Sequence, residues 1–101
     1  MTQHNQAILW QACDAVKAEA EALGLNVAGR SDGGDLVTLT LSRQASPLSV
    51  PRSGDLELWP GREDMMRSAY QLNRWATEKV NAINLAIEWE IQFALEGDAP
   101  I

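Results

Sequence analysis

The first apolar pattern along the chain repeats every three or four residues and predicts an amphipathic helix over residues 5–23. Alanine, the residue with the highest helix propensity, is frequent in the same stretch. The apolar stripe consists of Leu9, Ala12, Cys13, Val16, Ala20 and Leu23. Gly24 follows at a position where a left-handed backbone ends helices at low cost, so we predict that this helix ends there.

Two short segments after this helix predict a β-hairpin, one over residues 25–30 and one over residues 36–42. The second segment is rich in β-branched residues, and its apolar and polar positions alternate from Val37 to Leu41. Residues 31–35, with the sequence Ser-Asp-Gly-Gly-Asp, form a strong turn signal between the two strands. Serine, proline and glycine then predict a loop over residues 43–54.

A candidate third strand, residues 55–59, comes before the last large element of the chain. Pro60 suits the first turn of a helix, and acidic residues follow it where they complement the helix dipole. No glycine or proline occurs over residues 62–96, and Gly97 and Pro100 then give a helix stop signal. We therefore predict a long C-terminal helix.

A strict alternation within this last segment favours a different structure. Its apolar members are Ile83, Leu85, Ile87, Trp89, Ile91, Phe93 and Leu95. Alternation is typical of a strand, but the run is long for a strand and no turn signal precedes it. We predict a helix; the alternative makes residues 83–96 a strand and the chain αβββαβ.

A continuous helix over residues 62–96 would be roughly 52 Å long at 1.5 Å per residue, far more than the ~13 Å radius of gyration of a compact 100-residue domain. We expect that it breaks near residues 81–84 or that another chain covers it. The predicted fold is thus a single α+β domain over residues 1–101. It has an N-terminal helix, a hairpin with the third short strand, and a long C-terminal helix packed on the small antiparallel sheet.

The composition is that of an ordinary globular protein, with 46% hydrophobic and 22% charged residues. The net charge of −6 disfavours direct binding to nucleic acid or to anionic lipid, and favours protein partners that carry a basic patch. Solubility alone also accounts for such a charge. Residues 82–101 contain acidic side chains and no base. The first residues lack the pattern of a signal peptide, so we expect a cytoplasmic protein.

Candidate chemistry is sparse. One cysteine, Cys13, and one histidine, His4, provide neither a disulfide nor a zinc site, and a histidine-based triad would depend on a residue at the chain terminus. The carboxylates in the turn at residues 31–35 fit a turn better than a calcium loop. Asp55 and Glu57 could share one strand face and support acid–base chemistry, but no substrate-binding residues accompany them. We expect no enzymatic activity, no metal and no cofactor.

Tryptophan is abundant, with four in 101 residues, and tryptophan and arginine are enriched at interface hot spots. A small core also needs bulky side chains, so Trp10 and Trp89 suit either role, whereas Trp75 beside Arg74 favours an interface. The candidate partner-binding residues are Trp75, Glu88, Trp89, Glu90, Phe93, Arg43 and Arg52.

These observations predict a non-enzymatic acidic protein-binding module, an inhibitor or adaptor that docks on a larger macromolecule. In size and charge the chain is similar to accessory proteins of phages and mobile elements, including anti-CRISPR inhibitors. The alternative is a homodimeric structural or assembly protein that pairs through its C-terminal helix. The third hypothesis is an enzyme that uses Asp55 and Glu57.

Overall fold

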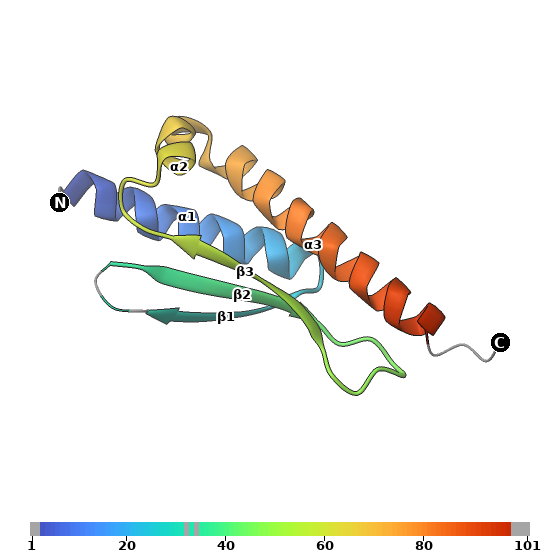
Figure 1. The fold of residues 1–101 in the computed structure, drawn as a ribbon. Coiled ribbons are helices and arrows are strands. Elements are labelled where there is room, and N and C mark those ends of the chain that lie inside the picture. The colour runs from blue at the N-terminus through green and yellow to red at the C-terminus, as the bar shows by residue number, and fades with distance from the viewer. Residues whose placement is uncertain (1–2, 32, 34, 98–101) are drawn as a thin grey trace.

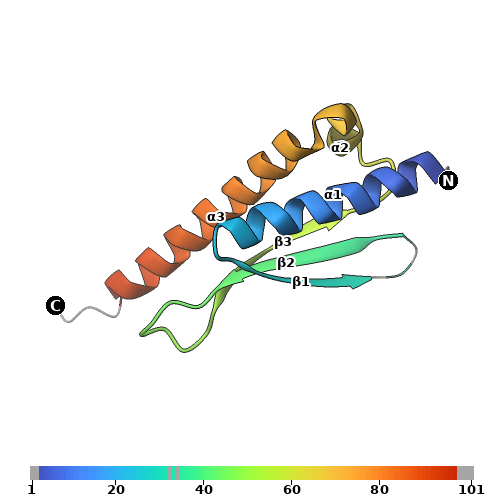
Figure 2. The ribbon, with the colours of Figure 1, turned by 180° about the vertical axis from the view of Figure 1, so that it is seen from behind.

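The computed structural model describes residues 3–31, 33 and 35–97, and it has two layers (Figures 1 and 2). One layer is an antiparallel sheet with strand order β1-β2-β3, and the other is helical. The elements are α1 (Gln3–Ala22), β1 (Asn26–Ser31), β2 (Val37–Arg43), β3 (Arg52–Leu58), α2 (Glu63–Arg67), the 3-10 turn η1 (Ala69–Gln71) and α3 (Leu72–Gly97). The predicted α+β fold is confirmed, and residues 83–96 are helical, so the αβββαβ alternative is wrong.

Both long helices cover the same face of the sheet, with α1 against β1 and α3 against β3 (Figure 1). The alternation in β2 explains this, because Val37, Leu39 and Leu41 all point toward the helices and are buried. Their partners in β3 are Leu58, Leu56 and Gly54. Polar residues dominate the opposite face, and they are exposed or half-buried except for Thr38, which is buried.

The third strand begins three residues earlier than the sequence indicated, at Arg52 rather than Asp55. Pairing with β2 extends as far as Arg43 opposite Arg52, so the end of the predicted loop over residues 43–54 is part of the sheet. Gly54 allows this extension, because a Cβ there would lie 2.8 Å from Cγ2 of Ile83 on α3. The close approach of strand and helix thus depends on a glycine. Asp32 and Gly34 of the predicted turn lie outside the described residues.

The long C-terminal helix breaks at residues 68–71, before α3 begins. Residues 81–84 are helical, so the first of the two expectations, a break there, is wrong, and coverage of the helix by another chain stays a prediction. Met65 is fully buried and holds α2 against the core, so the chain must turn before α3 can lie along the sheet. The Ser68 amide donates to the Met65 carbonyl at 3.2 Å, and the Gln71 amide donates to the Ser68 carbonyl at 2.7 Å. These tighter turns redirect the chain.

Arg62 holds this corner in place. Its guanidinium lies 5.3 Å from the ring centre of Trp59 and 5.6 Å from that of Trp75. Its Nε donates to Asp64 Oδ1 at 2.7 Å, and Lys79 Nζ lies 2.9 Å from Asp64 Oδ2. Partial burial of Asp64 disfavours its charged form. The hydrogen bond from Lys79 and the charge of Arg62 act against burial and lower the pKa of Asp64 to about 2.

Beyond this corner, α3 is long for so small a protein. Its 26 residues span about 39 Å at 1.5 Å per residue. Its C-terminal part runs past the end of α1, on the side of the loop between β2 and β3 (Figures 1 and 2). The Cα radius of gyration is accordingly 15.4 Å, above the ~13 Å of a compact domain of this length. None of the helices in the described part of the chain has the length and apolar character that crossing a membrane requires.

Candidate protein-binding surface

The helix α3 carries two apolar stripes. One faces α1 and the sheet, and its members are Leu72, Ala76, Val80, Ile83, Ile87 and Ile91. The other consists of Leu85, Trp89 and Phe93, which are 58%, 71% and 74% exposed. These three residues are four positions apart and therefore lie on one side of the helix, away from the core. We call them the outer α3 stripe.

The outer stripe is exposed because it lies on the side of α3 opposite the core-facing stripe. Arg43 marks the point where α1 ends beside α3: its Nη2 donates to the Leu23 carbonyl at 2.9 Å and to Asn84 Oδ1 at 3.0 Å. From that point on, the sheet layer covers only one side of α3. The alternating run that resembled a strand thus places apolar groups on two sides of a helix, and only one side is buried.

A groove lies on each side of Trp89. The first, of about 300 Å³, is lined by Leu85, Glu88, Trp89 and Gln92. The second, of about 440 Å³, is lined by Arg52, Trp89, Glu90, Phe93 and Ala94. The indole of Trp89 is therefore a ridge between two shallow apolar depressions, and charged groups lie at their margins. Such an apolar centre with a polar rim is the usual composition of a protein interface.

Five of the candidate residues from the sequence meet at this surface: Glu88, Trp89, Glu90 and Phe93 from α3, and Arg52 from the start of β3. Leu85 was missed as a candidate. The sequence feature that could have identified it is its position four residues before Trp89, because this spacing places the two side chains on one side of a helix. Arg52 could not be located from sequence, because strand pairing brings it beside α3.

Two candidates belong elsewhere, and their assignment to the interface is corrected. Trp75 is 3% exposed, because it faces the core near the start of α3 and stacks on Arg62. Arg43 is half-buried and joins α1 to α3 through its hydrogen bonds to Leu23 and Asn84. Trp75 is thus a core residue, and the Arg43 guanidinium is held by hydrogen bonds within the chain.

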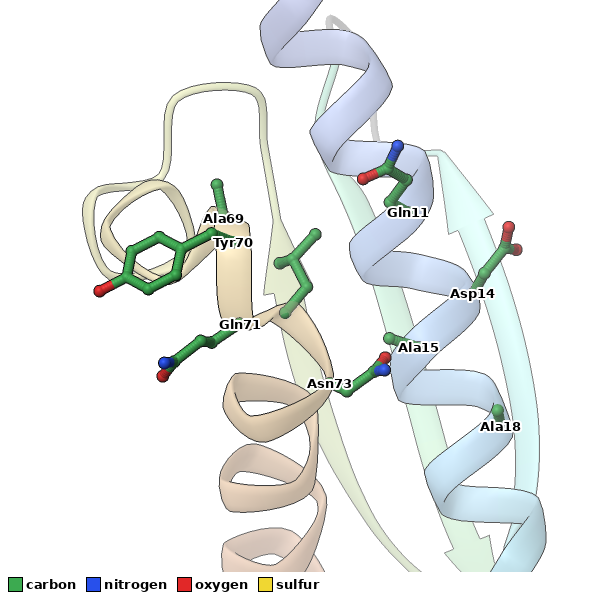
Figure 3. A pocket seen from close by; sticks show the side chains of 9 residues that line it. Gln11, Asp14, Ala15, Ala18, Ala69, Tyr70, Gln71 and Asn73 are labelled. Carbon is green, nitrogen blue, oxygen red and sulfur yellow. The ribbon is translucent and has the colours of Figure 1, made fainter.

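A separate depression, of about 550 Å³, lies between α1 and the η1 turn (Figure 3). Its lining includes Gln11 and Asp14 of α1, and Tyr70, Gln71 and Asn73 after the corner. In Figure 3 the side chains of Tyr70 and Gln71 point away from α1, and the Asp14 carboxylate points away from the depression. The polar groups do not converge, so this depression lacks the arrangement of a ligand-binding site.

The groups weighed for catalysis or metal binding are dispersed. Asp55 and Glu57 lie on the open sheet face, where Thr40 Oγ1 donates to Asp55 Oδ1 at 2.7 Å. Cys13 is half-buried, and its burial, followed by the charge of Asp14, raises the pKa of its thiol. Within residues 3–31, 33 and 35–97, no group of three or more histidine, cysteine, aspartate or glutamate side chains could hold a metal ion.

Comparisons of the chain with models of protein families, with curated proteins and with solved structures found no match.

Proposed function

We propose that this protein is a non-enzymatic binding module, an inhibitor or adaptor, that docks on a larger partner protein through the outer α3 stripe. The observation that carries the proposal is the exposure of Trp89 and Phe93, 71% and 74%, one helical turn apart on one side of α3. Large aromatic groups are the commonest anchors of protein interfaces. Burying one such side chain contributes about 1.5–3 kcal/mol of favourable free energy, which the chain does not gain while these residues are exposed to water.

The charge around the stripe favours a partner with basic groups. Residues 82–97 include Glu88, Glu90 and Glu96 and no basic residue. A partner with an apolar cleft and a basic rim would match both features of the surface. Pairing of the stripe with that of a second copy would bring the same acidic side chains together, and like charges at short range disfavour association. The homodimer through α3 is therefore the second candidate.

Site-specific photo-cross-linking in the native host tests the proposal. A benzophenone amino acid replaces Phe93 or Trp89, and in a matched control it replaces Tyr70, an aromatic residue that is 85% exposed near the other end of the helix layer. We expect one partner protein to be linked from both α3 positions and not from position 70. A partner linked equally from all three positions would contradict docking through the stripe.

Binding of the purified partner then gives the energetics. Trp89→Ala or Phe93→Ala should weaken binding by about 2 kcal/mol, roughly thirtyfold, if that side chain is a hot spot. Tyr70→Ala should leave binding unchanged. Glu88→Lys combined with Glu90→Lys should slow association and flatten its dependence on salt, because rim charges act mainly on the rate of encounter. Unchanged affinity in both alanine variants would overturn the proposal.

A further inference from the structure

The two edges of the sheet differ in how they are protected. On its open face, the β3 edge carries the acidic side chains Asp55 and Glu57, and Ile83 of α3 packs on its inner face at Gly54. Charged residues at an edge are a common means of preventing strand–strand association. The β1 edge, over Asn26–Ser31, carries a single charged residue, Arg30, and all its residues except the half-buried Val27 are exposed. Among the described residues, no strand lies beyond it.

The β1 edge also adjoins an unfilled apolar groove of about 280 Å³. Trp10 and Cys13 of α1 form one wall, and Val37 and Leu39 of β2 line the groove together with Gly29, Arg30 and Ser31 of β1. Gly29 has no side chain on the inner face, and a Cβ there would lie 3.2 Å from Cδ2 of Leu39. Trp10, on the other wall, is 57% exposed.

We propose that β1 pairs antiparallel with β1 of a second copy of this chain, with the two-fold axis at Ala28. The main-chain groups of an edge strand require a strand as the occupant. Side chains alternate between the two faces of a strand. In a symmetric dimer, the inner faces of the two sheets lie on the same side only if the two-fold axis passes through a residue that pairs with its own copy. Only an axis at Ala28 or at Gly29 pairs five residues within Asn26–Ser31.

The side chains select Ala28 over Gly29. With the axis at Ala28, Val27 of each copy lies opposite Gly29 of the other, and its methyl groups enter the groove below Trp10. On the outer face, Arg30 then lies opposite the uncharged Asn26. With the axis at Gly29, two glycines face each other and the groove stays empty. The register at Ala28 therefore buries more apolar surface and opposes no like charges.

The resulting dimer has a continuous six-stranded sheet, and it covers Trp10. It leaves the outer α3 stripe free, because α3 lies over β3 at the opposite edge (Figure 2). The proposal is thus independent of the proposed function. If both hold, each dimer presents two docking stripes.

Placing a positive or a negative charge at position 28 tests this register. Ala28 is exposed on the outer face, so Ala28→Lys and Ala28→Glu are compatible with the folded chain. Each variant alone sets like charges directly opposite each other and should weaken the dimer by roughly fivefold, the upper range for one cross-strand pair. An equimolar mixture of the two should associate at least as tightly as the unmodified chain. Sedimentation velocity over a concentration series measures all three.

Ser53 supplies the matched control, because it is exposed on the outer face of β3, at the other edge. Ser53→Lys and Ser53→Glu should leave the dimer unchanged. In a Cys13→Ser background, Ala28→Cys treated with the oxidant diamide should form a disulfide-linked dimer, whereas Ser53→Cys should not. Circular dichroism verifies that each variant remains folded.

Three results would overturn the proposal. The first is an unmodified chain that stays monomeric throughout the concentration series. The second is a dimer that responds to the Ser53 variants and not to the Ala28 variants. The third is a dimer lost in Trp89→Ala and Phe93→Ala but kept in the Ala28 variants, which would assign self-association to α3.

Discussion

The two halves of α3 differ in how many sides they bury. Over residues 72–80, the core-facing stripe is buried, and Trp75, which lies on the same side of the helix as Phe93, is also only 3% exposed. Over residues 82–97, a similar density of apolar residues covers two sides, and Trp89 is 71% exposed. The two tryptophans differ in their neighbours, because Trp75 stacks on Arg62 of the corner that precedes α3, whereas Trp89 lies between two shallow surface depressions. A tryptophan on a helix is therefore a core or a surface residue according to its neighbours, not according to its local sequence.

The largest expected effect separates the two tryptophans. Trp75→Ala should lower the free energy of unfolding by about 3–5 kcal/mol, because it leaves a cavity in the core. It also removes one of the rings that stack on Arg62. Trp89→Ala should change the stability of the monomeric chain by about 0.5 kcal/mol or less, as surface substitutions do. Urea denaturation monitored by circular dichroism measures both, and equal losses of stability would invalidate the comparison.

A medium effect is expected where α3 passes from one half to the other. Gly54→Ala places a Cβ 2.8 Å from Cγ2 of Ile83, so strand and helix must separate. We expect a loss of about 1–3 kcal/mol, the usual cost of overpacking. Combining it with Ile83→Ala removes the clash, so the double variant should lose less than the sum of the two single changes. Strict additivity would show that this contact does not set the position of α3.

The smallest expected effect on stability concerns Asp64, in the corner that precedes the first half of α3. In the folded chain the pKa of Asp64 is lowered to about 2, whereas in the unfolded chain it is about 3.9. The unfolded state therefore takes up this proton first as the pH falls. The stabilisation is complete above about pH 4 and is lost as the pH falls toward about 2.

Asp64→Asn should accordingly reduce the dependence of unfolding free energy on pH within this window. Lys79→Met, which removes one of the partners of Asp64, should reduce it in the same direction. Denaturant titrations between pH 2 and pH 5 provide the measurement, with both variants compared with the unmodified chain. An unchanged pH dependence in Asp64→Asn would mean that Arg62, Asp64 and Lys79 do not act as an ionic cluster.

Much of the architecture followed from the sequence by itself. The stripe that ends at Gly24, the alternation from Val37 to Leu41, and the absence of glycine and proline over residues 62–96 were enough to predict the α+β fold. These signals are local, because backbone propensity and the periodicity of burial act over neighbouring residues. For the same reason, aromatic and acidic residues near the C-terminus were recognised as candidates for one surface.

Only the tertiary structure decided which apolar side chains are buried. It placed Trp75 in the core and Trp89 in solvent, gave Arg43 a structural role, and brought Arg52 beside Phe93. It also moved the helix break to residues 68–71, where burial of Met65 fixes the direction of α2. Each outcome depends on contacts between residues far apart in the chain. The hydrophobic effect favours removal of apolar surface from water, but the periodicity of a sequence does not show which element will cover that surface.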